Sequence, residues 1–174
     1  MTLVIGEAAP TFELPDTEGA THALDGAPAT VVVFTCNHCP YALAWHDRLV
    51  DVARDYADRG VRVLAINSND PGKKPRDSYE AMQERVRADG GWPMPYLRDE
   101  DQEVARAYGA RTTPDVFVIA PDRSVAYRGA PDADYGEPAL RAEWLREALD
   151  DVLEGQPVRR AETEPVGCSI KWKG

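Results

Sequence analysis

The sequence contains little cysteine, little histidine and no long apolar run. Three of its 174 residues are cysteine and three are histidine, which is too little cysteine for a domain held together by disulfides. No apolar stretch approaches the roughly 20 residues that a membrane-spanning helix needs, and the first residues lack the basic start and apolar stretch of a secretory signal. We therefore expect a soluble protein of the cytoplasm.

Basic residues are outnumbered as well. Lys and Arg total 20 against 30 Asp and Glu, so the formal net charge is −10. Nucleic acids and anionic membranes are bound by clustered Lys and Arg, so we expect no nucleic-acid and no membrane partner. The length and the 43% share of hydrophobic residues are typical of one globular domain with its own core.

The apolar pattern predicts strands that alternate with helices, and therefore one α/β domain. A hairpin near residues 9–19 forms an N-terminal extension; the domain with this extension is expected to cover 1–155, and a C-terminal tail 156–174. Asp77, with Glu80 three residues later, resembles a capping box and predicts a helix start. We expect strands at 30–35, 61–66, 96–97, 116–119 and 125–128, and helices at 42–58, 77–89, 102–108 and 138–154.

Two cysteines, Cys36 and Cys39, lie between a predicted strand and a predicted helix. Free N–H groups and the positive end of the dipole at a helix start favour an anion, so a thiolate at Cys36 should have a lowered pKa and react readily. The spacing of three residues lets Cys39 reach Cys36 and close a reversible disulfide. The pair therefore predicts redox chemistry, with Cys36 as the exposed nucleophile and Cys39 as the resolving thiol.

Six motifs along the chain carry a family resemblance. They are Gly6-x-x-Ala9-Pro10-x-Phe12-x-Leu14, Cys36-Asn37-His38-Cys39-Pro40-Tyr41, Asn67-Ser68-Asn69-Asp70, Pro95-Tyr96-Leu97-x-Asp99, Thr113-Pro114-Asp115 and Gly167-Cys168-Ser169-Ile170-Lys171-Trp172-Lys173. With them the chain resembles the thioredoxin superfamily, and nearly its whole length is similar to the peroxiredoxin-like redoxin branch of AhpC/TSA type. The resemblance implies a thioredoxin-like fold, which is a central mixed sheet flanked by helices. It also implies a cis peptide at Thr113-Pro114 beside the cysteines, with Pro114 leaving nearby backbone free to grip an extended thiol substrate.

The sequence departs from the family pattern at informative positions. Thr30 stands six residues before Cys36, where thioredoxin has a buried acid, so the usual proton acceptor is missing. Neither Cys36 nor Cys39 fits the Pro-x-x-x-Thr-x-x-Cys pattern of peroxiredoxins. His38, directly before Cys39, resembles disulfide-introducing oxidases, in which an imidazole stabilises the thiolate. We therefore expect His38 to lower the pKa of Cys36 and to make the disulfide less reducing than that of thioredoxin.

The third cysteine, Cys168, lies in a tail where Val166, Cys168, Ile170 and Trp172 alternate with small or polar residues. An extended tail would turn these four side chains toward one surface. One interpretation is a strand that covers an apolar patch, with the thiol as a small hydrophobe. The other is a third redox cysteine close to Cys36 or Cys39, and the sequence leaves both open.

The leading functional hypothesis is a thiol–disulfide oxidoreductase that acts on protein or small-molecule thiols and disulfides and is served by an electron-donating thiol system. The alternative is an antioxidant thiol peroxidase that reduces hydroperoxides through a sulfenic acid. A binding module that kept the fold without catalysis is the third class. We expect no organic cofactor, and no metal either, because a structural zinc site needs four ligands.

Overall fold

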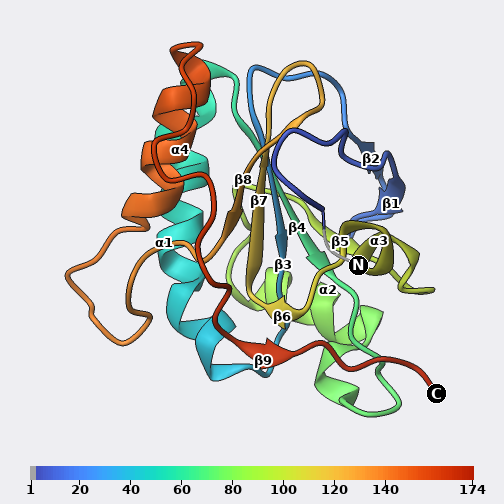
Figure 1. Cartoon of the computed structure of the whole chain (residues 1–174). Coiled ribbons are helices and arrows are strands. Elements are labelled where there is room, and N and C mark those ends of the chain that lie inside the picture. Colours follow the sequence, from blue (N-terminus) through green and yellow to red (C-terminus); the bar gives the residue numbers. More distant parts are fainter. Residues whose placement is uncertain (1–2) are drawn as a thin grey trace.

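A five-stranded mixed sheet forms the centre of the molecule (Figure 1). The computed structural model describes residues 3–174, so the first two residues of the expected 1–155 domain lie outside the described part. In spatial order the strands are β5 (Tyr96–Arg98), β4 (Arg62–Asn67), β3 (Thr30–Phe34), β7 (Asp115–Ile119) and β8 (Val125–Gly129). The strands β3, β4 and β5 are parallel, whereas β7 and β8 run antiparallel to their neighbours.

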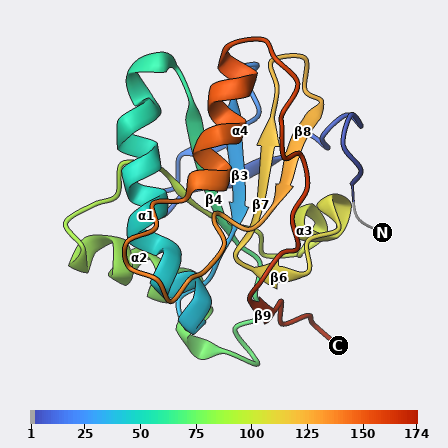
Figure 2. The same ribbon diagram turned by 60° about the vertical axis from the view of Figure 1, so that its left-hand side comes forward.

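Helices cover both faces of this sheet (Figure 2), so the expected central mixed sheet with flanking helices is confirmed. The expected N-terminal hairpin is also present. The helices are α1 (Pro40–Tyr56), α2 (Tyr79–Ala88), α3 (Glu103–Tyr108) and α4 (Glu143–Leu153), with short 3-10 turns η1 (Ala57–Arg59) and η2 (Pro75–Asp77); the small strands are β1 (Glu13–Pro15), β2 (Thr21–Ala23), β6 (Thr112–Thr113) and β9 (Cys168–Ser169). Within residues 3–174, each helix is too short or too polar to reach across a lipid bilayer.

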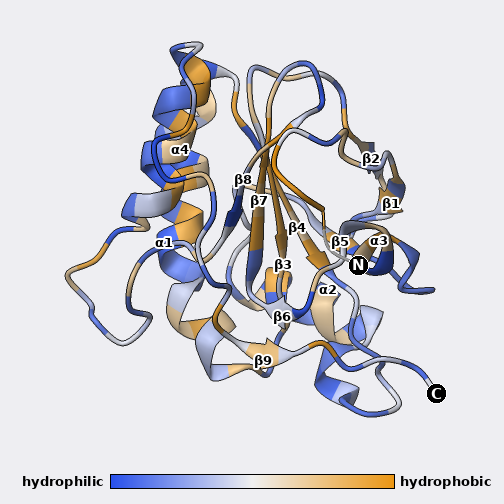
Figure 3. Cartoon of the chain, in the orientation of Figure 1, coloured by the Kyte–Doolittle hydropathy of each residue, from blue (hydrophilic) through white to orange (hydrophobic). Residues whose placement is uncertain are grey.

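The central strands are apolar on both faces because both faces are covered (Figure 3). In β3, Val31 and Val33 belong to the core beneath α1, α2 and α4, while Val32 and Phe34 belong to the core beneath α3 and the N-terminal segment. Successive side chains of a strand point to opposite faces, and all five residues of β3 are buried. This two-sided packing fixes where β3 ends, and with it the position of the cysteines that follow.

Two helices begin later than the sequence predicts. The helix expected from Pro138 begins at Glu143, because Arg48 of α1 donates hydrogen bonds to three carbonyl groups within 134–137 and holds that segment open. The helix expected from Asp77 begins two residues later, and its cap is Ser78, whose hydroxyl accepts the N–H of the third helical residue at 3.1 Å. The side chain of Asp77 is thus free for another role.

The C-terminal tail returns to the end of the sheet where β3 stops (Figure 1). Its strand β9 pairs antiparallel with β6, so that Cys168 lies opposite Thr113. A Cβ atom on Gly167 would lie 2.2 Å from the carbonyl oxygen of Thr113, so only glycine allows this close approach. Ile170 is buried in the core on the α3 side of the sheet. Cys168 and Trp172 also pack inward, whereas Val166 is exposed, so the tail covers an apolar surface with three of the four side chains expected to do so.

Candidate active site

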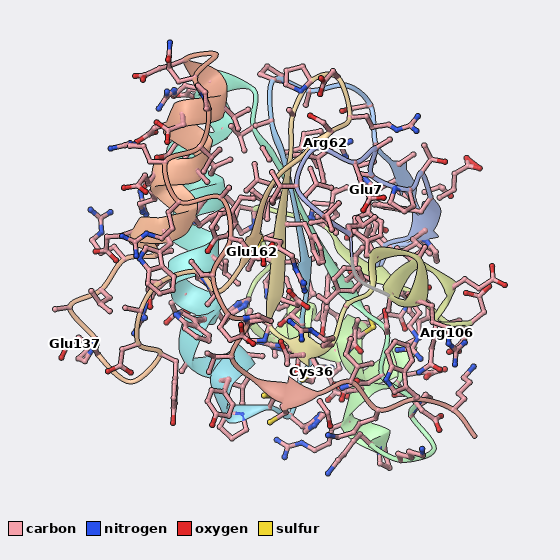
Figure 4. All side chains as sticks on the ribbon, viewed as in Figure 1. Glu7, Cys36, Arg62, Arg106, Glu137 and Glu162 are labelled. Carbon is pink, nitrogen blue, oxygen red and sulfur yellow. The ribbon has the colours of Figure 1, made fainter. Side chains whose placement is uncertain are left out.

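Cys36 and Cys39 lie just beyond β3, at the start of α1. Cys39 is the N-cap residue of this helix and Pro40 is its first residue. Figure 4 labels Cys36 beside β9, at the lower edge of the sheet. Pro40 has no N–H to leave unpaired and its fixed φ suits a first helical position, which explains why the helix starts there.

Both sulfur atoms contact Thr113. The Sγ of Cys36 lies 3.3 Å from the Thr113 hydroxyl, and the Sγ of Cys39 lies 3.2 Å from the Thr113 carbonyl oxygen. The peptide bond between Thr113 and Pro114 is cis, as the resemblance implied. The structure therefore brings Cys36, Cys39, Thr113 and Pro114 together although 74 residues separate Cys39 from Thr113.

The expectation of an exposed Cys36 is wrong. Both Cys36 and Cys39 are 0% exposed, because Tyr41 and the half-buried Cys168 of β9 pack against them. Their surroundings nevertheless contain polar groups, among them the Thr113 hydroxyl. The buried sulfurs thus keep hydrogen-bonding partners, but a large substrate has no direct access to them in this conformation.

The prediction of a lowered pKa at Cys36 is also wrong. A hydrogen bond with Cys39, burial and the negative charge of Asp77 together raise the pKa of Cys36. The pKa of Cys39 is lowered instead, because the Cys36 thiol donates to its sulfur, as do the Cys168 thiol and the backbone N–H groups of Ala42 and Cys168. The Thr113 carbonyl opposes this effect, but several donors outweigh one acceptor. The anion favoured by the helix N-terminus therefore lies on the N-cap residue Cys39.

Asp77 is the site residue that the sequence analysis missed. Its carboxylate is 0% exposed and accepts the backbone N–H of Asn37 at 2.6 Å and the Nδ1–H of His38 at 2.5 Å. The side-chain amides of Asn67 and Asn69 donate to it at 3.2 and 3.0 Å. The sequence held two clues to this role of Asp77. Ser78 is an equally good helix cap, so Asp77 was not needed as one, and the Asn-rich motif at the end of β4 had no assigned role.

His38 connects this buried carboxylate with the surface. A carboxylate can only accept here, so Nδ1 carries the proton and Nε2 is left as an acceptor. The side chain of His38 is 12% exposed. Ligand atoms of Cys36, His38 and Asp77 lie within 4.8 Å of one another, so an imidazole oriented by an acid lies near the Cys36 sulfur.

The same three residues are the group within 3–174 that could hold a metal ion. A metal on Nδ1 of His38 would have to replace the hydrogen bond to Asp77. Protein zinc sites use thiolate, imidazole and carboxylate ligands, commonly four of them. The hydrogen-bonded arrangement of His38 and Asp77 favours proton transfer over metal binding.

The side chain of Asn37 is fixed by two side chains and one backbone carbonyl. Its Oδ1 accepts hydrogen bonds from the Tyr96 hydroxyl at 2.8 Å and from Arg85 at 2.9 Å, and its amide donates to the carbonyl oxygen of Arg76 at 2.8 Å. Arg85 also donates to the carbonyl oxygen of Cys36 at 3.2 Å. The turn between the two cysteines is therefore rigid, although it lacks the Gly-Pro of thioredoxin.

Cys168 lies against the two buried cysteines. Burial, together with the hydrogen bond that its thiol gives to Cys39, raises the pKa of Cys168 to about 11. The tail is thus a strand that covers part of the core, and its cysteine also lies close to Cys39.

Comparison with known proteins places the chain in a family. The pattern that defines the AhpC/TSA family matches residues 5–128. The chain belongs to the AhpC/TSA family. This confirms the resemblance to the redoxin branch of the thioredoxin superfamily, and the fold is thioredoxin-like.

This AhpC/TSA-family chain is similar over almost its whole length to two solved structures. One is an uncharacterized conserved protein from Geobacillus kaustophilus, with 41% identity, a TM-score of 0.92 and coverage of 98% of this chain and 93% of that one. The other is the hypothetical protein SMc02350 from Sinorhizobium meliloti 1021, with 37% identity, a TM-score of 0.92 and coverage of 100% and 97%.

A curated relative is the thiol-disulfide oxidoreductase ResA of Geobacillus thermodenitrificans. It is 28% identical over 122 residues, which are 67% of this chain and 64% of ResA. The chain thus spans somewhat less than two thirds of the length of this curated relative.

Proposed function

We propose that this AhpC/TSA-family protein is a thiol–disulfide oxidoreductase whose redox-active pair is Cys36 and Cys39. The observation that carries the proposal is that the two cysteines pack together at the start of α1 and both contact Thr113, the residue before the cis-proline. The name of the relative ResA, a thiol-disulfide oxidoreductase, supports it.

The charge distribution assigns a step to each sulfur. Once the tail that packs against it moves aside, the Cys39 thiolate attacks a substrate disulfide and forms a mixed disulfide, and one substrate thiolate leaves. Cys36 then gives its proton to His38 and attacks the Cys39 sulfur, which closes the Cys36–Cys39 disulfide and releases the second substrate thiolate. The substrate gains the two electrons that the pair loses. These roles are the reverse of those that the sequence predicted.

The proposed substrates are protein or small-molecule disulfides, and a dithiol donor returns the pair to the reduced state. The reverse reaction oxidises a dithiol substrate by the same steps. The cytoplasmic location expected from the sequence stays a prediction, which cell fractionation tests.

Insulin reduction by dithiothreitol tests the proposal. We expect the wild-type protein to accelerate precipitation of the insulin chains, and Cys36→Ser or Cys39→Ser to lower the rate by about 100-fold or more, because each sulfur forms an obligatory covalent bond. Oxidised glutathione should convert the wild type to a form lighter by two hydrogens, with the disulfide inside the tryptic peptide 1–48, which holds both cysteines. Absence of this disulfide from Cys168→Ser as well as from the wild type would refute the proposal.

Membership of the AhpC/TSA family favours thiol peroxidation as the second candidate. There the Cys39 thiolate attacks a hydroperoxide and becomes a sulfenic acid, the O–O bond breaks and the alcohol or water leaves, and Cys36 condenses with the sulfenic acid to the same disulfide and water. Peroxide consumption by the same variants separates the two functions. Fast peroxide turnover with no acceleration of insulin reduction would establish the peroxidase.

A further inference from the structure

The tail strand β9 occupies the backbone edge beside the cis-proline. Thr113 of β6 pairs with Cys168, and Thr112 pairs with Ser169. This is the edge that the proposed function needs for an extended thiol substrate, because the residue before Pro114 contacts both active-site sulfurs. The chain thus places one of its own cysteines where a substrate cysteine would lie.

The tail is held there by specific contacts. The Lys171 backbone donates its N–H to the Asn69 side chain at 2.8 Å and accepts the N–H of Asp70 at 2.8 Å. Gln102 donates to the same Lys171 carbonyl at 2.9 Å. Asn69 donates with its other end to Asp77, so the tail and the buried carboxylate share one anchor.

The three sulfurs form a chain from the interior to the surface. Cys168 packs against the two buried cysteines, and Cys39 is the cysteine that shifts its pKa. Cys36 and Cys39 are fully buried, whereas Cys168 is partly exposed. A disulfide can therefore pass from the inner pair to a sulfur that external molecules reach.

We propose that the tail is a built-in substrate, and that Cys168 exchanges with the Cys36–Cys39 disulfide to form Cys39–Cys168. This inference rests on the proposed function. The Cys168 thiol loses its proton to water and its thiolate attacks the Cys39 sulfur, the Cys36–Cys39 bond breaks, and Cys36 leaves as a thiolate that takes up a proton from water. One disulfide is replaced by another, so no further oxidant is needed.

Formation of the Cys36–Cys39 disulfide itself makes Cys168 a better nucleophile. The pKa of Cys168 is raised by burial and then by the hydrogen bond to Cys39 and the charge of Cys39. Once Cys39 is in a disulfide, its charge is gone and the second cause is removed. An external dithiol can then attack Cys168 in the Cys39–Cys168 bond, with the low-pKa Cys39 as leaving group, and its second thiol completes the reduction.

Peptide mapping after oxidation with glutathione disulfide tests the inference. Trypsin leaves Cys36 and Cys39 together in peptide 1–48 and Cys168 in peptide 161–171, so a disulfide to Cys168 joins the two peptides, and in Cys36→Ser that disulfide can only be Cys39–Cys168. We expect Cys36→Ser to give the joined peptides as its main oxidised form. We expect Cys168→Ser to form the disulfide within 1–48 but to be reduced by dithiothreitol at least about tenfold more slowly than wild type, because its only disulfide is buried.

Gly167→Ala provides a test that leaves all three cysteines in place. Its Cβ would collide with Thr113, so the yield of joined peptides should fall in a Cys36→Ser background, while Gly136→Ala, whose Cβ meets only the Asp134 carboxylate at 3.4 Å, should leave it unchanged. Formation of the 1–48 disulfide in wild type, with only a glutathione adduct in folded Cys36→Ser, would overturn the inference and leave the proposed function intact. No disulfide in any form of the protein would overturn both.

Discussion

Asp77 shows how one residue changes the chemistry of its neighbours. Thr30 cannot serve as the acid that thioredoxin keeps before its first cysteine, and Asp77 brings a carboxylate to the site from another part of the chain. Its bonds to Asn37 and His38 fix both residues between the cysteines. Its charge also disfavours an anion on Cys36, so the same group that orients the imidazole helps to keep the Cys36 proton in place.

The first prediction concerns this charge. Asp77→Asn should lower the pKa of Cys36, because it removes a negative charge within 4.8 Å of the sulfur. At an effective dielectric near 20 such a charge is worth a few kcal/mol, so we expect the alkylation midpoint of Cys36 to fall by about one to two pH units. The midpoint is measured in a Cys39→Ser background, so that Cys36 is the reactive thiol of peptide 1–48.

Asp47→Asn is the matched control for this measurement. Asp47 lies on the exposed side of α1, where water screens its charge, and its replacement should leave the midpoint in place. An Asp77→Asn midpoint equal to that of Cys39→Ser alone would contradict the electrostatic role of Asp77.

The second prediction concerns the proton of Cys36. His38→Gln should slow closure of the Cys36–Cys39 disulfide by about 100-fold, the usual scale of a lost general base, and added imidazole should restore part of the rate. Quenched-flow alkylation followed by mass analysis measures closure. His22→Gln serves as control because His22 pairs with Asp16 in the N-terminal hairpin; equal rates for the two variants would refute the role of His38.

At the scale of elements, the sequence predicted well the strands and helices that follow from a continuous apolar pattern, but it did not predict where two of the helices start. The strand β3 and the helix α1 agree with their expected positions within a few residues, since two-sided burial and a 3.6-residue apolar repeat leave clear marks in the sequence. The starts of α2 and α4 were wrong because contacts with distant residues decide them: Arg48 holds the segment before α4 open, and Asp77 turns inward to the cysteines.

The third prediction therefore addresses the cap of α2. Ser78→Ala should lower the free energy of unfolding by about 1 kcal/mol, because the N–H of Ala81 loses its acceptor. Ser78→Gly should lower the free energy of unfolding by only about a few tenths of a kcal/mol. Urea denaturation measures both values. Glycine is the poorer helix former, so a Gly variant less stable than the Ala variant would show that Ser78 does not act as a cap.

At the scale of the whole molecule, the site is assembled by topology. Four segments meet at the end of the sheet where β3 stops (Figure 1). They are the end of β3, the turn η2, the strand β6 and the tail strand β9. The sequence predicted the contiguous part, Cys36 to Cys39, and the family motif supplied Thr113 and Pro114. It missed Asp77 and left open whether Cys168 joins them, since side chains 39 and more residues apart meet only once the sheet order is known.

The last prediction concerns a second buried carboxylate, which lies directly after the cis-proline. Asp115 is paired with Arg128 at 3.3 Å and accepts the N–H of Arg111 at 3.1 Å. Burial outweighs these contacts and raises the pKa of Asp115 from 3.8 to about 6. Between these two values the folded protein holds a proton that the unfolded chain has lost, so the stability due to protonated Asp115 declines as the pH rises from about 4 to about 6.

Asp115→Asn should remove this decline. The free energy of unfolding of the variant, minus that of the wild type, should therefore increase by up to about 3 kcal/mol between pH 4 and pH 7, since a shift of about two pKa units corresponds to that energy. Urea denaturation at several pH values measures the difference. Asp122→Asn is the control of opposite sign, because hydrogen bonds from Ser124 lower the pKa of Asp122 and its contribution is lost only as the pH falls. Parallel pH profiles for the wild type and Asp115→Asn would show that Asp115 ionises in the folded protein as freely as in the unfolded chain.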